Sequence, residues 1–362
     1  MSFLLGINTA VPDFAIGKQD FERFVADQSK ADIQLLRKLR WLAEKSGIET
    51  RYAALPDYQS PNEALLYYRN GAPFRAGIAE RMALYADLAL HLSVKAAARL
   101  VSRFGAPTHL IYTSCTGLAA PGLEMSLLRA LHLPANVFRH TVNFMGCHAA
   151  LHALRTAHYI CAAEPAARVL VVCTELCSLH YQDAIHDDAL LANLLFGDGS
   201  AAVYMTGEAD LQTPLLEFKD FYAELLASGE EDMSWALGEA SFAMRLSSYV
   251  PQLLSTHIGT ALHSAGVKWQ QAPDHSWNWA LHPGGKTILD QLGRELGLTE
   301  EQLAPSRGVL REFGNMSSAS VLFVLQKILN QGELAHKPTI LAAFGPGLSV
   351  EMAYAIPLNP TA

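Results

Sequence analysis

The feature that most constrains this chain is a regular alternation of two kinds of segment from residue 108 onward. Short apolar runs, such as VLVVCTEL at residues 169–176, are separated by segments in which apolar residues recur every three or four positions. The first kind has the length of a buried strand, and the second has the periodicity of a helix. Strands that alternate with helices and are apolar throughout predict an α/β fold whose sheet is covered on both faces.

The same patterns give the expected elements. We expect strands over residues 109–115, 169–176, 199–207, 277–283, 338–345 and 349–356. We expect helices over residues 20–46, 79–104, 121–133, 147–165, 188–196, 247–266, 285–297 and 317–332.

Two related phrases indicate an internal duplication. FGDG at residues 196–199 leads into SAAVYM, and FGPG at residues 344–347 leads into LSVEMAYA. The least regular stretch, residues 207–232, is the natural seam between two halves. We therefore expect one half over residues 1–210 and the other over residues 211–362.

Composition limits the function classes. The chain has 362 residues, half of them apolar, and a formal charge of 27 − 35 = −8. This negative charge offers no general attraction for nucleic acid or for anionic membranes. The first residues, MSFLLGINTAVPDF, lack the basic start of a signal peptide, and no apolar run reaches the length of about 20 residues that spans a bilayer. We expect a cytoplasmic protein that binds neither nucleic acid nor membrane.

Three residues are candidates for chemistry. Cys147 follows a glycine at the start of an apolar helical segment, where the helix dipole lowers a thiol pKa and favours a nucleophilic thiolate. His282 ends an apolar strand before Pro-Gly-Gly, so its side chain is expected to enter a cleft. Asn315 immediately precedes a helix. Each has a simpler interpretation, as a buried cysteine, a structural histidine and a helix N-cap respectively.

Together these residues belong to a more specific pattern. TSCTG, GCHAALHALRTA, ELCSLHYQ, LFGDGSAA, WALHPGGKTILD, FGNMSSAS and FGPGLSVEMA follow one another in this order. The chain thereby resembles the type III polyketide synthases, the chalcone-synthase-like family of the thiolase superfamily, over roughly residues 113–353. Its CTG and ELCSLHYQ phrases are similar to those of bacterial members.

The resemblance implies a duplicated αβαβα thiolase fold, a homodimer and an acyltransferase. Cys147 would carry the starter acyl group as a thioester. His282 would keep the thiolate deprotonated, and with Asn315 it would bind the thioester oxygen of malonyl-CoA as CO₂ leaves. Repeated condensation and ring closure would give a pyrone, resorcinol or phloroglucinol-type product. CoA thioesters would be the substrates, with no metal or redox cofactor.

The resemblance also assigns positions around the cavity. Phe196 matches the aromatic residue at the mouth of the active site, and Gly345, Pro346 and Gly347 match a scaffold loop that lines it. Ala120 stands where many relatives have a methionine that reaches into the neighbouring subunit. Further positions that match the cavity wall are Cys115, Cys177, His180, Trp235, Met244 and Ser317.

A basic stretch near the N-terminus matches the CoA-binding region. Lys38 and Lys45 stand at positions that contact CoA phosphates, and Trp41 replaces the basic residue between them. Arg37 and Arg40 are near enough to compensate. The alternative is a solvated helix face.

Disulfides and metal sites are not expected. Five cysteines without a secretion signal do not form a disulfide framework, and none are spaced as Cys-x-x-Cys. The segment HYQDAIHDD superficially resembles a metal site, with His180, Asp183, His186 and Asp187, but it falls in the loop-to-helix region of the family pattern.

Two other functions remain open. A ketoacyl-ACP synthase of the fatty-acid initiation type shares the fold and a Cys-His-Asn triad, although its histidine is usually followed by Gln-Ala-Asn. A catalytically silent homologue is the second. The starter acyl-CoA, the number of extensions and the mode of cyclisation cannot be deduced; both fatty acyl-CoA and malonyl-CoA are plausible starters.

Overall fold

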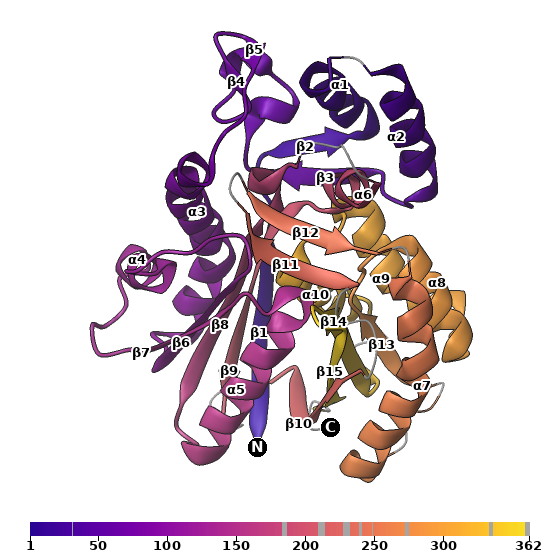
Figure 1. Cartoon of the computed structure of the whole chain (residues 1–362). Helices are drawn as coiled ribbons and strands as arrows, with labels where there is room; N and C mark the ends of the chain where they lie inside the picture. Colours follow the sequence, from indigo (N-terminus) through magenta and orange to yellow (C-terminus); the bar gives the residue numbers. More distant parts are fainter. Residues whose placement is uncertain are drawn as a thin grey trace.

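A computed structural model describes residues 1–30, 32–182, 187–208, 214–226, 232–238, 241–247, 249–271, 274, 276–332 and 336–358 (Figure 1). The strands are β1 Ser2–Ala10, β2 Phe14–Gly17, β3 Thr50–Ala53, β4 Tyr68–Arg69, β5 Ala72–Pro73, β6 His109–Ser114, β7 Phe138–Asn143, β8 Arg168–Leu176, β9 Asp198–Thr206, β10 Leu216–Leu225, β11 Met233–Leu237, β12 Phe242–Leu246, β13 Asn278–Leu281, β14 Thr339–Gly345 and β15 Ser349–Pro357. The α-helices are α1 Lys18–Gln28, α2 Ile33–Lys45, α3 Ile78–Phe104, α4 Leu123–Ala130, α5 Ala149–Ala163, α6 Asp187–Leu195, α7 Val250–Trp269, α8 Lys286–Glu295, α9 Glu300–Phe313 and α10 Ser320–Leu329.

The strand order of the main sheet shows the internal duplication. It runs β13-β14-β15-β10-β1-β9-β8-β6-β7. Outward from the centre, β1 pairs antiparallel with β9, β9 antiparallel with β8, and β8 parallel with β6. The other side repeats this order, because β10 pairs antiparallel with β15, β15 antiparallel with β14, and β14 parallel with β13. The two halves meet where β1 pairs with β10.

Three apolar clusters separate the layers of the fold. One lies around α3 and the outer face of the first half, and a second contains the buried faces of α5 and α10. The third lies around α7, α8 and α9 against the second half. The two halves of the main sheet thus form two layers, with α5 and α10 between them and other helices on their outer faces. This arrangement is the duplicated αβαβα thiolase fold that the family resemblance implied.

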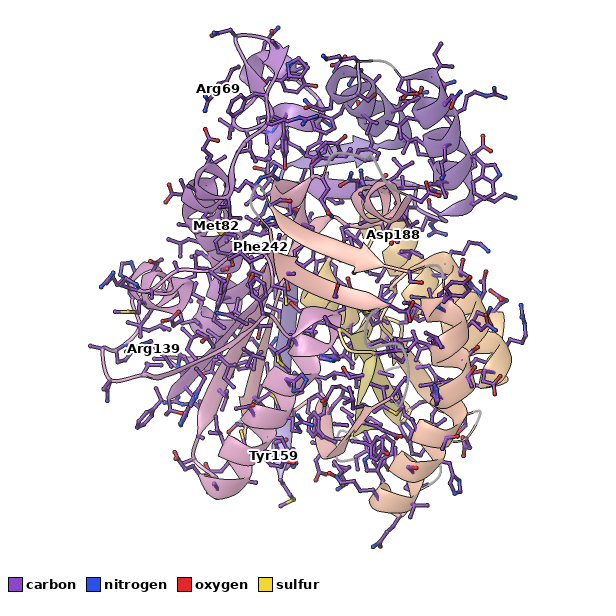
Figure 2. The ribbon with its side chains drawn as sticks, in the orientation of Figure 1. Arg69, Met82, Arg139, Tyr159, Asp188 and Phe242 are labelled. Atoms are coloured by element: carbon purple, nitrogen blue, oxygen red, sulfur yellow. The ribbon has the colours of Figure 1, made fainter. Side chains whose placement is uncertain are left out.

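Smaller elements gather at one end of the molecule. Figure 1 shows α1, α2 and the hairpins β2–β3 and β4–β5 above the main sheet, with the hairpin β11–β12 across its front. In Figure 2, Arg139 and Tyr159 lie at the periphery, whereas Phe242 of β12 lies near the middle and is 1% exposed.

Two sequence-based expectations need correction. The single helix expected over residues 20–46 is two helices, because Asp32 starts a new one by accepting hydrogen bonds from the N–H groups of Gln34 and Leu35. The seam expected over residues 207–232 contains β10, one of the two strands that join the halves. The expected boundary between residues 210 and 211 lies outside the described residues. In the described part of the chain, every helix is too short or too polar to cross a bilayer.

Candidate active site

The candidate nucleophile lies on a tight turn that leads into the central helix α5. Cys147 is the middle residue of a 3₁₀ turn, Gly146–His148, and is 8% exposed. Gly146 has φ +78°, and a Cβ atom on it would lie 2.1 Å from Cδ of Pro346. Only glycine fits this conformation at this closeness. The turn is therefore held directly against the loop of residues 345–347 from the second half.

His282 and Asn315 come from the second half, at the ends of different elements. His282 follows β13, and its N–H donates to the carbonyl of Ala342 in β14 at 2.8 Å. Asn315 follows α9, whose C-terminal Gly314 has φ +69°. The N–H of Asn315 donates to the carbonyl of Leu195 at 2.9 Å, so this loop is also bonded to the first half.

The amide of Asn315 connects the three candidates. Its Oδ1 accepts from the N–H of Ser317 at 2.9 Å, and its Nδ2 lies 3.4 Å from the carbonyl of Gly284, two residues after His282. The side chains of Asn315 and Ser317 also form hydrogen bonds with Cys147 that lower the pKa of its thiol. The structure thus places Asn315 between Cys147 and the turn that follows His282, and the catalytic roles of the three residues stay predictions.

Burial dominates the electrostatics of this centre. It raises the pKa of Cys147 to about 12, and it lowers the pKa of His282 to about 3. Desolvation thus opposes the effect of the helix terminus expected for Cys147, and in the free protein it outweighs the favourable hydrogen bonds. Within the described residues, neither ring nitrogen of His282 has a hydrogen-bond partner. The imidazole of His282 is therefore neutral, and no group of the described residues occupies its lone pair or its N–H.

Cys147 lines a cavity of about 20 Å³. A volume of this size holds about one water molecule and no acyl chain, so substrates must displace part of the wall. The lining residues are Cys115, Thr116, Gly146, Cys147, Cys177, Phe196, Met233, Trp235, Ser317 and Pro346.

Trp235 and its aromatic neighbours form another part of the cavity wall. The indole N–H of Trp235 donates to the carbonyl of Cys115 at 2.6 Å. His180 stacks on Phe242 with ring centroids 4.3 Å apart and meets Trp235 edge-on at 5.8 Å. Since the N–H of Phe242 donates to its Nδ1, the proton of His180 is on Nε2, which donates to the carbonyl of Thr116. His180 is thus a neutral structural part of this wall, with its pKa lowered to about 3 by burial.

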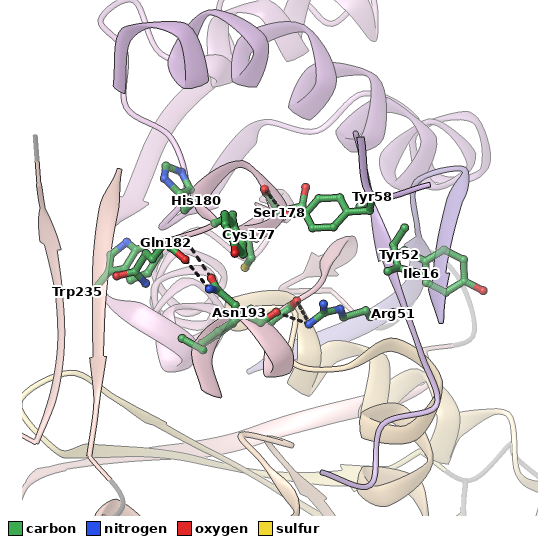
Figure 3. A pocket seen from close by; sticks show the side chains of 14 residues that line it. Ile16, Arg51, Tyr52, Tyr58, Cys177, Ser178, His180, Gln182, Asn193 and Trp235 are labelled. Atoms are coloured by element: carbon green, nitrogen blue, oxygen red, sulfur yellow. Dashed lines mark hydrogen bonds between the residues drawn. The ribbon is translucent and has the colours of Figure 1, made fainter. Parts of the chain in front are cut away.

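A second cavity, of about 30 Å³, lies behind this wall. Figure 3 shows Trp235 and His180 on one side of it and Arg51 on the opposite side. It shares three lining residues, Cys177, Phe196 and Trp235, with the cavity at Cys147. These three side chains therefore form a partition between two cavities.

This architecture matches one family along nearly the whole chain. The models for the N-terminal and C-terminal domains of chalcone and stilbene synthases match residues 1–209 and 218–356. The chain belongs to the chalcone and stilbene synthase family. Its members include the type III polyketide synthases, as the resemblance indicated, and this membership implies an acyl-transferring enzyme. It also favours a polyketide synthase over the ketoacyl synthase alternative.

Similar solved structures support the same family assignment. Polyketide synthase PKS-I from the brown alga Ectocarpus siliculosus is 27% identical with a TM-score of 0.92, over 99% of this chain and 98% of that chain. The C-terminal type III polyketide synthase domain of Steely1, a hybrid synthase from Dictyostelium, is 30% identical with a TM-score of 0.88, over 98% of this chain and 99% of that one. The I375F mutant of CsyB, at 23% identity and a TM-score of 0.88 over 99% and 100% of the two chains, shares the fold.

One of the four CoA candidates, Lys45, lies at a separate cavity of about 350 Å³. Lys45 lines it together with Trp41 of the same helix, and Lys286 lines it from the start of α8. Gly284 and Gly285, which follow His282 and Pro283 in the chain, also line it. Lys286 was not expected from the sequence, although a cation directly after HPGG is a signal that could have identified it.

The other basic candidates on α2 lie differently. Lys38 forms an ion pair with Asp187, and Arg40 forms one with Glu22 at 2.5 Å. Arg37 is exposed on the same helix. None of the three lines the 350 Å³ cavity.

Glu175 is a buried residue of the site that sequence reasoning missed. It stands on β8, and its Oε2 accepts from the N–H of Cys115 and the hydroxyl of Thr116, both at 2.9 Å. Its Oε1 accepts from the hydroxyl of Ser318 in the second half. Burial raises its pKa, and these hydrogen bonds lower it. A carboxylate in the apolar run VLVVCTEL was the available signal.

The remaining candidates fall outside the centre or outside the description. Ala120 lines another cavity, near α4 and β7, away from Cys147. Met244 stands opposite Trp235 in the β11–β12 hairpin, and its side chain lies outside the described residues, as do Asp183 and His186 of the segment that resembled a metal site. Among the described residues no group of three or more potential metal ligands converges.

Proposed function

We propose that this synthase condenses malonyl-CoA repeatedly onto a starter acyl group held on Cys147, and that the product closes to a pyrone, resorcinol or phloroglucinol-type ring. The proposal rests chiefly on the amide of Asn315, which contacts the nucleophile and the turn after His282 in one buried centre. CoA thioesters are the substrates, and no metal or redox cofactor takes part. A homodimer in the cytoplasm is part of the proposal, as the family resemblance implies.

Acylation is the first step. The Cys147 thiol attacks the starter thioester while His282 accepts its proton; the bond between the acyl carbon and the CoA sulfur breaks, and the CoA thiolate takes that proton from His282. Burial keeps the imidazole of His282 neutral in the free enzyme, so a ring nitrogen carries the lone pair that takes this proton, and burial also makes the imidazole a weaker base.

Condensation follows in the same centre. Malonyl-CoA loses CO₂, and the electron pair of the broken C–C bond becomes an enolate. Asn315 Nδ2 and a protonated nitrogen of His282 stabilise the enolate oxygen. The enolate carbon attacks the acyl thioester, the new C–C bond forms, and the Cys147 thiolate leaves and is reprotonated.

The 350 Å³ cavity is suited to the CoA end of the substrates. Lys45 and Lys286 supply positive charge for phosphates, and Trp41, which is 58% exposed, offers a flat face for the adenine ring. Lys286 forms an ion pair with Asp290 at 2.7 Å that a phosphate would have to compete with.

The size of the inner cavity favours a short starter. With about 20 Å³ beside Cys147, an acetyl- or malonyl-sized group requires less displacement of the wall than a fatty acyl chain does. We therefore infer a short starter, with malonyl-CoA as the first candidate.

Mass spectrometry of the products tests the function. Wild-type enzyme is incubated with malonyl-CoA alone and with a panel of acyl-CoA starters, beside Cys147→Ala. The control is Cys161→Ala, which removes a buried thiol of α5 outside the cavity. We expect pyrone or phenolic products from the wild type and the control, and none from Cys147→Ala. Wild-type enzyme that consumes no malonyl-CoA under any condition would overturn the proposal.

A further inference from the structure

The residue after the nucleophile reaches across to the second half of the molecule. His148 is 3% exposed, and its Nε2 lies 2.6 Å from the hydroxyl oxygen of Ser349. The hydroxyl of Ser349 in turn donates to the carbonyl of Pro346 at 3.2 Å. These bonds form a chain from the turn that carries Cys147 to a residue that lines its cavity.

Close packing reinforces this chain. A Cβ atom on Gly345 would lie 2.3 Å from Nε2 of His148, so the imidazole rests directly on the backbone of the loop. On the other side of the turn, Gly146 rests on the ring of Pro346. The loop is therefore held between two consecutive contacts from the nucleophile turn, one on each side of Cys147.

The imidazole of His148 is itself supported from one face of α5. His152, one helical turn along, meets it edge-on with ring centroids 4.8 Å apart. Arg155 donates to Nδ1 of His152, whose Nε2 therefore carries the proton and donates to Glu351 at 3.2 Å. Arg155 also donates to Glu351 at 2.9 Å. His152 is thus unable to rotate without breaking two contacts.

His148 is held neutral by these surroundings. Burial and the neighbouring His152, His282 and Arg155 lower its pKa to about 3. Its contribution is therefore geometric, through one hydrogen bond and one packed surface.

We propose that His148 is a positioning residue that sets the distance of the loop of residues 345–347 from Cys147, and thereby the number of condensations completed before ring closure. The proposal rests on the proposed function. Loosening the His148–Ser349 link widens the cavity at Pro346, so a longer intermediate fits before release, while acylation of Cys147 is unaffected.

The test compares His148→Ala and Ser349→Ala, which remove the link from either end, with His148→Gln, whose amide N–H can replace that of Nε2. His263→Ala, exposed on α7, is the control. We expect the ratio of longer to shorter products to rise about fivefold in both alanine variants, the factor that corresponds to about 1 kcal/mol for one neutral hydrogen bond. His148→Gln and the control should keep the wild-type ratio. An unchanged ratio in both folded alanine variants would overturn the proposal.

A second readout does not depend on turnover. Alkylation of Cys147 by iodoacetamide and by its N-benzyl derivative compares access of a small and a bulky reagent. Both alanine variants should raise the relative rate of the bulky reagent about fivefold, again the factor of one lost hydrogen bond. Unchanged selectivity would overturn the positioning role even if wild-type enzyme formed no polyketide, an outcome that would by itself overturn only the proposed function.

Discussion

The buried and unpaired imidazole of His282 lowers the stability of the folded protein. Its two ring nitrogens are buried and without a partner among the described residues, at a cost of about 1–3 kcal/mol for such groups. In the proposed mechanism those nitrogens must be free for the Cys147 proton and the substrate oxygen. Activity and stability therefore oppose each other at this residue.

This opposition gives a first prediction. His282→Ala should lower the rate of product formation by at least about 100-fold, the usual contribution of a general base. Its melting temperature should nevertheless stay close to that of the wild type, because losing two unpaired nitrogens offsets the cavity that alanine leaves. Calorimetry and product assays on the same sample check both halves. His91→Ala, exposed on α3, should change neither; a large loss of stability in His282→Ala would contradict the argument.

The side chain of Trp235 is expected to limit the space available to the starter and the growing chain. Trp235 lines both the cavity at Cys147 and the cavity of about 30 Å³ behind it. Trp235→Ala should therefore join the two cavities and remove the hydrogen bond to the Cys115 carbonyl. We expect longer starters to be accepted and products with more extensions, read by mass spectrometry. Leu237→Ala, on the same strand but 64% exposed, is the matched control and should give wild-type products. Identical product masses from both variants would show that Trp235 does not limit the chain.

The nucleophile turn, Gly146–His148, packs closely against the connection between β14 and β15. The closeness of this contact between elements predicts how the protein responds to a small added group. Gly146→Ala introduces both left-handed strain and a clash with Pro346, whereas Gly71→Ala at nearly the same φ, +74°, meets open space. Gly71→Ala should cost about 1 kcal/mol of unfolding free energy. Gly146→Ala should cost about 3 kcal/mol or more and abolish activity, because overpacking adds to the strain. Urea titration measures both; equal costs would mean that the loop yields freely.

Which elements the sequence predicted depends on how clearly each one shows its burial. The strand expected over residues 169–176 is β8, Arg168–Leu176, because all but the first of its residues are buried and the run is apolar. In contrast, β10 was missed because its sequence LEFKDFYAEL mixes buried and exposed positions across a polar stretch. The helix α9 was missed because Pro305 stands inside it, which normally argues against a helix.

Some features of the candidate site could be predicted from the sequence, and others could not. Motif spacing selected Cys147, His282 and Asn315 as candidates, and their roles stay predictions that rest on the family resemblance. The electrostatics could not be predicted, because whether a helix terminus or desolvation decides a thiol pKa depends on burial that only the fold defines. Trp235 was expected at the cavity wall, but that it separates two cavities follows only from the packing of the β11–β12 hairpin.

At the scale of the whole molecule, several buried histidines make stability depend on pH. Burial lowers the pKa of His148, His180 and His282 to about 3 and that of His152 to about 4. Each stays neutral in the folded state where the unfolded chain would bind a proton, so its contribution to stability is complete above pH 6.5 and is lost as the pH falls below that value. The buried carboxyl of Asp198, with its pKa raised to about 6, has the opposite effect and partly compensates.

His180 allows one such contribution to be isolated, because it lies in the wall and not among the reacting groups. Wild-type enzyme should lose about 1.4 kcal/mol more unfolding free energy per pH unit than His180→Gln between about pH 6.5 and 4, the equivalent of one proton. Urea unfolding at pH 7.5, 6 and 5 measures this, with His263→Gln as the exposed control that should follow the wild type. His180→Gln starts less stable, since glutamine replaces a stacked ring, and the gap to wild type should narrow by about 1.2 kcal/mol between pH 6 and pH 5. A gap that stays constant with pH would mean that His180 binds a proton in the folded protein, and hence that its Nδ1 does not accept the hydrogen bond from Phe242 on which the aromatic wall depends.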